Sequence, residues 1–436
     1  MSGDSPGDIQ FHGQARISRW LMLVSLCLSY MVYAVLLNSV GTVILQSILS
    51  FGISKESGSI LEACKDFSIA GVSFAVASYL PRLGYRRAMM LGHTLVAAAC
   101  VLMALHPRFG TAEVLFATIG VTFALIKVSV YSSIGLLTAA AKRHASLMNV
   151  LEGLFMVGVL GGYWLFGAFI DSRAPANLVW VHVYWLLAGA SLIVVVLLAL
   201  ARLDESAARS VSTGSGGAFG DMLRLLTRPM VYVFIISIFL YVLIEQGLGT
   251  WLPTFNSQVL RLPAAMSVQM ASIYAGSLAL GRLLAGYVLR RVSWYALLSG
   301  CLVGMILLVI LVLPLAAHVH LRPDVNWFNA PFVAYAFPLI GLLMAPIYPA
   351  VNSVMLSALP KDRQAAMTGL IVVFSALGGT SGSFIVAFLF THFGGSHAFY
   401  ITLIPMAGIL VALFFFRRET AVAESALQSV DGQARR

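Results

Sequence analysis

Charged residues are scarce in this chain, and their scarcity excludes a soluble globular protein. Only 10% of the 436 residues are charged and 60% are hydrophobic, whereas about a quarter of the residues in soluble domains are charged. Twelve apolar runs reach the length of about 20 residues that a helix needs to cross a bilayer. We place these spans at 19–49, 57–80, 88–105, 112–140, 146–171, 178–201, 230–252, 263–289, 294–317, 329–357, 365–392 and 397–417.

Features of several other protein classes are missing as well. The four cysteines all fall inside predicted spans, so no disulfide scaffold is expected. The sequence has no cluster of metal ligands and no phosphate-binding glycine loop, so we expect no enzyme, metal, cofactor or ATP-driven pump. No small-residue cleavage pattern follows the first apolar run, which predicts an uncleaved first span. The absence of an N-x-S/T sequon favours a bacterial inner membrane.

Positive charge is present in excess, and its distribution is uneven. The net charge is +10, and nineteen of the 27 Lys and Arg residues lie on the side of the predicted spans that holds both termini, against five in the opposite loops. This asymmetry is the positive-inside pattern, which predicts cytoplasmic termini. The basicity therefore reflects topology, and we expect a lipid bilayer and no nucleic acid as its partner.

A polar stretch rich in Ser and Gly, 202–229, divides the spans six and six. We therefore predict an all-α membrane protein with twelve helices in two pseudo-symmetric halves. Its parts are an N-terminal half at 1–201, a cytoplasmic linker at 202–229, a C-terminal half at 230–417 and a cytoplasmic tail at 418–436.

Internal repeats support the two halves. "GVTFALIKVSVYSS" (120–133) aligns with "GLLMAPIYPAVNSV" (341–354), and "GLFMVGVLGG" (153–162) resembles "GLIVVFSALGG" (369–379). Each pair is six spans apart, as two parallel six-helix halves require. The first alignment pairs Lys127 with Tyr348 and Tyr131 with Asn352, and these four residues are expected to face one another across the pseudo-twofold axis.

The basic turn "ASYLPRLGYRR" (77–87) resembles the cytoplasmic signature G-x-L-x-D-R-x-G-R-R of the major facilitator superfamily. In that signature the Asp caps and ion-pairs a neighbouring helix end, but Pro81 stands at the Asp position here and Ala77 at the first Gly. The second copy, "GYVLRRVSWYA" (286–296), has Arg290 at the Asp position. The resemblance assigns gating roles to Arg82, Gly84, Arg86, Arg87, Arg290 and Arg291.

"LYVLIEQGLGTWLPTF" (240–255), "ALGRLLAGYVLRR" (279–291) and "APIYPAVNSVMLSALP" (345–360) are similar to the fucose–galactose–glucose:proton symporter branch. This branch uses one acid in span one and another in span four. Span one has no acid here, and the position in span four is Lys127. Any coupling would therefore have moved to Glu62, Asp66 or Glu245.

Charges inside spans are costly, so they normally face a wet cavity or a partner. Glu62 and Asp66 share one helix face with Lys65 at its edge. We expect this triplet to face an aqueous cavity, either as a self-neutralising cluster or as a proton-exchanging site. Glu152 and Arg282 are assigned structural roles.

Lys127 lies near the middle of span four, and Asp66, Glu62 or Glu245 would keep its ammonium group charged. Two interpretations remain open for it, a substrate-facing cation or a structural ion pair. The expected substrate site comprises Lys127, Tyr131, Glu245, Gln246, Tyr348 and Asn352.

The resulting hypothesis is a monomeric secondary active transporter in the inner membrane. It would move a small polar solute, sugar-like or an organic anion, by alternating access coupled to protons. The alternatives are an efflux transporter for drugs or siderophores and a transport-inactive receptor or scaffold. Span five lacks the proline of the antiporter signature, which weighs against drug–proton exchange, and a scaffold gains nothing by burying Lys127 and Glu245.

Overall fold

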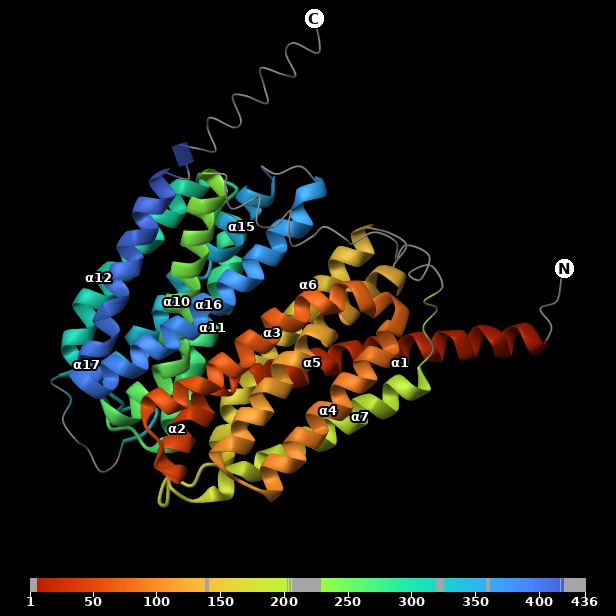
Figure 1. The fold of residues 1–436 in the computed structure, drawn as a ribbon, viewed down its shortest axis with the longest axis horizontal. Coiled ribbons are helices and arrows are strands. Elements are labelled where there is room, and N and C mark those ends of the chain that lie inside the picture. Colours follow the sequence, from red (N-terminus) through yellow and green to blue (C-terminus); the bar gives the residue numbers. More distant parts are fainter. Residues whose placement is uncertain are drawn as a thin grey trace, which may run out of the picture. The chain divides into compact units, whose positions relative to one another are not determined.

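The computed structural model is helical over most of the residues that it describes, with no strand among them (Figure 1). It describes residues 6–137, 141–201, 203, 205, 229–317, 319, 325–357, 361–415 and 417–418. Almost all of the predicted linker and tail lies outside these ranges. The all-α fold class is confirmed.

The chain forms two compact units, which we call unit 1 and unit 2. Unit 1 comprises Met1–Ser39, Ser68–Phe169 and Asn177–Ser215, and unit 2 comprises Val40–Phe67, Ile170–Ala176 and Gly216–Arg436. The helix that carries the charged triplet contributes to both units, with its first part, including Glu62, Lys65 and Asp66, in unit 2.

Unit 1 is a bundle of long helices around an aromatic and aliphatic core. Helix α4 packs against α5 and α7, and α1 packs against α5, α6 and α7. Buried side chains such as Tyr33, Phe116 and Phe166 fill the bundle. Its helices are α1 (Pro6–Asn38), the second part of α3 (Lys55–Leu83), α4 (Tyr85–Leu105), α5 (Phe109–Leu137), α6 (Ala141–Phe169), the 3-10 helix η1 (Leu178–His182) and α7 (Val183–Leu200).

The first predicted span, 19–49, is wrong as a single helix because the chain breaks at Ser39, between α1 and α2 (Val40–Phe51). The Asn38 side-chain amide donates to Ala34 O at 2.9 Å, and the Ser39 hydroxyl donates to Leu36 O at 2.8 Å. Such local side-chain bonds compete with the helical ladder. The break leaves α1 in unit 1 and α2 in unit 2.

Unit 2 is built around α10 (Pro229–Gln258), which packs against α2, α11 (Ala264–Val288) and α16 (Lys361–Phe393). Its core is strongly aromatic: Phe255, Phe337 and Phe399 lie with ring centroids 5.0–5.7 Å apart. Unit 2 also contains α12 (Trp294–Ala316). Helix α17 (Gly395–Ala398) and the 3-10 helix η3 (Phe399–Thr402) lie at the start of the last span, Gly395–Phe415.

The predicted span 329–357 is interrupted as well. It consists of α13 (Phe332–Ala336), the 3-10 helix η2 (Phe337–Leu339), α14 (Ile340–Met344) and α15 (Ile347–Ser357). Pro338 and Pro346 lie at these junctions, and a proline inside a helix removes a backbone donor and clashes with the preceding turn. The two prolines are present in the sequence, but the continuous apolar run around them predicted a single unbroken span.

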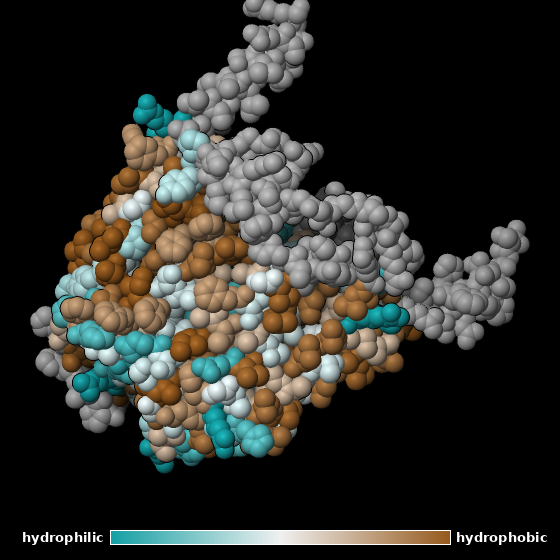
Figure 2. Space-filling model, in the orientation of Figure 1, coloured by the Kyte–Doolittle hydropathy of each residue, from teal (hydrophilic) through white to brown (hydrophobic). Residues whose placement is uncertain are grey.

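Among the described residues, ten helices are long and apolar enough to cross a membrane. The long helices α3 and α11 occupy the two remaining predicted spans, 57–80 and 263–289. Large apolar side chains lie exposed on the outside, among them Leu283, Ile404 and Leu311 at 76%, 68% and 67%. Figure 2 shows the hydrophobic surface over both groups of helices. Such a surface suits lipid, and helices are the elements that satisfy most of their backbone hydrogen bonds internally, as a bilayer demands.

Candidate functional site

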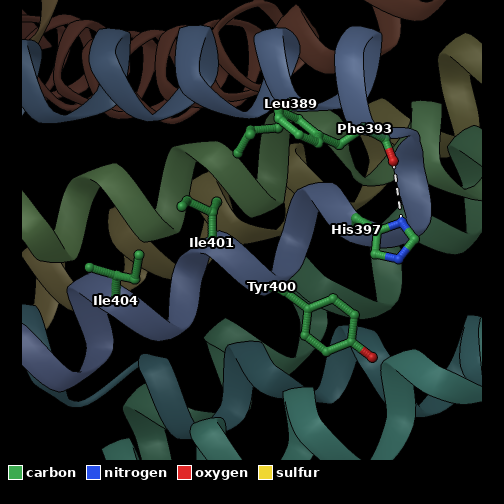
Figure 3. Close-up of a pocket in the computed structure, with 6 residues that line it drawn as sticks. All are labelled: Leu389, Phe393, His397, Tyr400, Ile401 and Ile404. Atoms are coloured by element: carbon green, nitrogen blue, oxygen red, sulfur yellow. Dashed lines mark hydrogen bonds between the residues drawn. The ribbon is translucent and has the colours of Figure 1, made fainter.

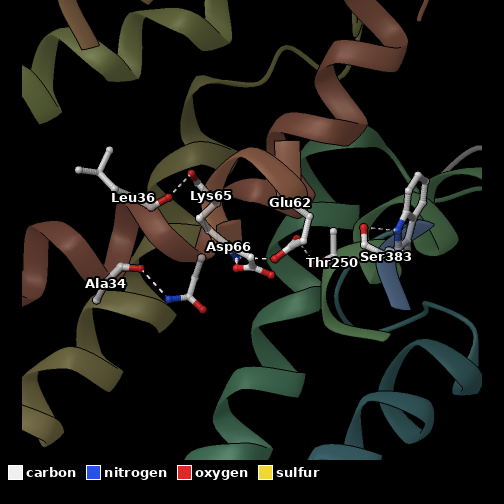
Figure 4. A network of polar contacts seen from close by, with 10 residues as sticks. Ala34, Leu36, Glu62, Lys65, Asp66, Thr250 and Ser383 are labelled. Atoms are coloured by element: carbon white, nitrogen blue, oxygen red, sulfur yellow. Dashed lines mark hydrogen bonds and ion pairs between the residues drawn. The ribbon is translucent and has the colours of Figure 1, made fainter. Parts of the chain in front are cut away.

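A buried acid–lysine network occupies the first part of α3 in unit 2 (Figure 4). It consists of Glu62, Lys65, Asp66 and Thr250. The Lys65 ammonium donates a hydrogen bond to Glu62 Oε1 and lies 3.5 Å from Asp66 Oδ1. The Thr250 hydroxyl of α10 donates to the other Glu62 oxygen at 2.8 Å. Both Glu62 oxygens are therefore paired, and Lys65 lies between the two acids.

This arrangement corrects the expectation that the triplet faces an aqueous cavity. Glu62, Lys65 and Asp66 are only 0%, 5% and 7% exposed. The helical spacing brings Lys65 onto Glu62, as expected for residues three apart. The partner that makes burial possible is Thr250, 188 residues away, because buried charges need pairing and hydrogen bonds.

Small residues let the helix backbones close around the network. A methyl group added at Gly379 on α16 would lie 2.7 Å from Asp66 Oδ2 and 3.1 Å from Gln246 Cγ. A methyl group at Gly41 on α2 would collide with the Thr250 carbonyl oxygen. Beside Thr250, the Trp251 indole donates to Ser383 Oγ at 3.1 Å and ties α10 to α16. The two glycines thus allow the close helix packing in which the acid–lysine network is buried.

A second polar group in unit 2 contains Glu245, which was predicted from span seven. Its other members are Tyr241, one turn earlier on α10, and Arg282 on α11. The Tyr241 hydroxyl donates to Glu245 Oε1 at 3.1 Å, and the Arg282 guanidinium of α11 lies 3.9 Å from the same oxygen. The Glu245 and Arg282 side chains are 23% and 46% exposed. Arg282, assigned to a helix contact from the sequence, therefore also faces an acid. Gln246 packs beside Gly379.

Tyr348 and Asn352, on α15, lie near this group. The rings of Tyr348 and Tyr241 are 5.6 Å apart. Asn352 Oδ1 is buried without a hydrogen-bond partner in the described part of the chain, and so are the hydroxyls of Ser375 and Thr380 on α16. Buried polar atoms are normally satisfied, so these oxygens have unused capacity for water or a solute.

Lys127 lies in unit 1 with different surroundings from the acid–lysine network. It is exposed, and its charged neighbour is Glu152 of α6. The Tyr131 hydroxyl donates to Glu152 Oε1 at 2.6 Å, and the Lys127 ammonium lies 5.9 Å from the centre of the Phe123 ring. Lys127, Tyr131, Glu152 and Tyr30, whose ring centroid lies 6.0 Å from that of Tyr131, form what we call the Lys127 cluster.

Sequence reasoning missed Glu152 and Tyr30 as members of this cluster. From the sequence, Glu152 is assigned a structural role, and its hydrogen-bond donor in the structure is Tyr131. An acid within a span is a functional candidate by default, and this rule alone would have kept Glu152 among the candidate site residues. The involvement of Tyr30 depends on how α1 packs against α5 and α6, which no local pattern indicates.

The residues assigned to gating lie at two turns. Gly84, Arg86 and Arg87 form the start of α4, and the side chain of Arg82 lies outside the described residues. Arg290 and Arg291 follow the end of α11, where the Arg291 guanidinium lies 5.1 Å from the centre of the Tyr287 ring.

A surface groove of about 490 Å³ in unit 2 contains none of the predicted site residues (Figure 3). It is lined by Leu389, Phe393, His397, Tyr400, Ile401 and Ile404. His397 Nδ1 lies 3.2 Å from Phe393 O and is occupied there. The groove offers a polar solute few partners, so the site is better sought at the charged clusters.

Comparison with protein-family models identifies one family. The model of the Major Facilitator Superfamily matches residues 22–383. The glycerol-3-phosphate transporter of Haemophilus influenzae is 28% identical over 199 residues, which make up 43% of this chain. The chain spans 41% of the length of that relative.

Solved transporter structures share the fold at low sequence identity. The nucleoside transporter NupG superposes with a TM-score of 0.69 at 14% identity, covering 92% of this chain and 98% of that one. A bacterial homologue of the lysosomal transporter Spinster gives 0.69 at 15%, covering 97% and 98%. A D-xylose–proton symporter gives 0.66 at 15%, covering 92% and 97%.

Proposed function

Because the chain belongs to the major facilitator superfamily and is a multi-pass membrane transporter, we propose that it carries a small organic anion by proton-coupled alternating access. The observation that carries this proposal is the exposed Lys127 in a span, flanked by Tyr131, Glu152 and aromatic rings. A cation on a membrane-spanning helix is retained for a partner or a substrate.

The Lys127 cluster suits a solute with an acidic group. Glu152 already has a hydrogen-bond donor in Tyr131, so the Lys127 ammonium retains donors for an incoming carboxylate or phosphate. The nearby, partly exposed ring of Phe123 would contact an apolar part of the solute. The Haemophilus relative is a glycerol-3-phosphate transporter, and glycerol 3-phosphate carries an acidic phosphate group.

The polar group of unit 2 supports a solute that also bears hydroxyl groups. Asn352, Ser375 and Thr380 have buried oxygens without partners among the described residues, and Tyr348 presents a ring beside them. Hydroxyl groups both donate and accept hydrogen bonds and would satisfy these atoms. A sugar-like solute is therefore the second candidate.

Uptake into proteoliposomes discriminates between the two. We would offer radiolabelled glycerol 3-phosphate, D-xylose, L-fucose and uridine to the purified protein and to Lys127→Met. We expect uptake of the phosphate ester by the wild-type chain and its loss in the variant. Uptake of a neutral solute that survives Lys127→Met would contradict the anion proposal and favour the sugar-like one.

Proton coupling is assigned to the acid–lysine network, with Asp66 as the proton-binding group. With both acids ionised the buried network carries one excess negative charge, and one proton makes it neutral. Asp66 is 3.5 Å from Lys65, whereas both Glu62 oxygens are paired. Glu245, with Arg282 and Tyr241 on one oxygen, is the second candidate.

The coupling assignment has its own test. Asp66→Asn should abolish accumulation driven by a pH gradient while preserving solute exchange at equal pH, and Glu245→Gln tests the alternative in the same way. If both single variants and the double variant kept gradient-driven accumulation, the transported proton would not bind to Asp66 or Glu245. The inner-membrane location and cytoplasmic termini remain proposals based on the charge asymmetry.

A further inference from the structure

The turn between α3 and α4, in unit 1, carries a helix start that its own residues do not cap. Helix α4 begins at Tyr85 after Gly84, whose φ of +89° lies in the left-handed region. Glycine has no side chain to accept the free N–H groups of the first turn, which every helix leaves unsatisfied. A carboxylate from far along the chain fills this role: Glu205 Oε1 accepts the Arg86 backbone N–H at 2.8 Å.

A second hydrogen bond joins the same segments in the opposite direction. The Arg86 guanidinium donates to the carbonyl oxygen of Ala201 at 2.6 Å, and Ala201 is the residue that closes α7. The carboxylate therefore lies at the N-terminus of α4 and the guanidinium at the C-terminus of α7. Each charge has the sign that the helix dipole favours at that end.

Gly84 makes room for this arrangement. A methyl group added to it would lie 2.5 Å from Glu205 Oε2, and the positive φ would strain any other residue. The glycine of the signature-like turn is thus explained by the approach of a carboxylate. Leu80, Tyr85 and Ala88 form a small buried cluster beneath the turn, so the backbone around Gly84 is held from inside as well.

We propose that Glu205 is a positioning residue for transport. It supplies, from a distant part of the same chain, the acid that the α3–α4 turn lacks at Pro81. It fastens the first residues after α7 to the α3–α4 turn, so that the end of α7 and the start of α4 move together. The inference rests on the proposed transport function for its consequence, but the fastening itself is a property of unit 1. Its loss should slow the conformational step and leave solute binding unchanged.

Hydrogen exchange measures the effect of the Glu205–Arg86 contact on α4 without any solute. In Glu205→Ala, amide exchange in a peptide covering 85–90 should accelerate by about five- to tenfold, the effect of losing a helix cap. Glu113→Gln is the matched control, because it removes the same charge near the start of α5, at the other end of α4. Unchanged exchange in Glu205→Ala would overturn the proposal.

Transport kinetics and rescue show whether the fastening matters for function. With radiolabelled glycerol 3-phosphate as the probe, Glu205→Ala should lower the maximal uptake rate at an unchanged KM. Pro81→Asp, which restores an acid to the turn itself, should recover the rate in the Glu205→Ala background, and Glu205→Asp should retain part of it. A lost rate that neither change restores would indicate general misfolding and overturn the proposal.

The two proposals fail in different ways. A wild-type chain that carries no anion and no sugar would refute the proposed function, while the exchange experiment would still report on Glu205. Conversely, active transport with an unaltered rate in Glu205→Ala would refute only the role of Glu205.

Discussion

Two lysines on membrane-spanning helices have opposite surroundings. Lys65 is buried between two carboxylates, one of which also accepts from Thr250. Lys127 is exposed, and its neighbouring acid, Glu152, accepts a hydrogen bond from Tyr131. The first lysine is part of the packing between helices, whereas the side chain of the second is exposed.

The difference teaches that the number of charges in a span does not identify a binding site. A buried ion pair contributes little by its presence, but removal of one partner is costly because the other charge remains unpaired. An exposed charge keeps its hydration and can exchange water for a ligand. The same substitution at the two lysines should therefore have different consequences, for stability at Lys65 and for binding at Lys127.

The largest effect is expected for Lys65→Met. It leaves Glu62 and Asp66 buried together without a cation, and the free energy of unfolding should fall by about 3–5 kcal/mol. Denaturant unfolding of the detergent-solubilised protein measures this change. Lys127→Met is the control and should change the free energy by less than about 1 kcal/mol. Equal losses would mean that exposure does not distinguish the two lysines.

Lys127→Met should next affect binding. Loss of a hydrogen bond from a charged donor amounts to about 1.5–3 kcal/mol, so the apparent KM for an anionic solute should rise roughly tenfold to a hundredfold. Initial uptake rates in proteoliposomes give this value. Lys127→Arg keeps the charge and should lose less. An unchanged KM in Lys127→Met would place the anion elsewhere.

Thr250→Val tests how much the hydrogen bond from Thr250 to Glu62 stabilises the buried network. It removes the donor to Glu62 Oε2 with little change in shape, and the free energy of unfolding should fall by about 1.5–2 kcal/mol. Thr254→Val, one turn further along α10, is the matched control, because the Thr254 hydroxyl is buried without a partner among the described residues. That change should be close to neutral. Comparable losses in both variants would show that Thr250 contributes through packing alone.

The smallest effect is expected for Tyr131→Phe in the Lys127 cluster. The bond to Glu152 is exposed, so its loss should lower the free energy of unfolding by about 0.5 kcal/mol. The same substitution in a Glu152→Gln background should add almost nothing. A loss above about 2 kcal/mol would show that this cluster is as enclosed as the acid–lysine network.

The existence of the membrane-spanning helices could be predicted from the sequence, because a long apolar run in lipid has to form its backbone hydrogen bonds within itself. The contact between Glu62 and Lys65 was also predictable, since residues three apart lie on neighbouring positions of a helix. The breaks at Ser39 and around Pro338 were harder to predict. Local hydrogen bonds and prolines interrupt helices within runs whose hydropathy does not change.

The sequence by itself determined the helical class, the family resemblance and which charged residues lie within spans. Only the tertiary structure decided the distant partners of charged residues: Glu62 with Thr250, Glu152 with Tyr131, and Arg86 with Glu205. The physical reason is that lipid is as apolar as the protein core. A helix that is hydrophobic all round carries no periodicity to indicate its inward face, so its rotation and its distant partners are set by packing.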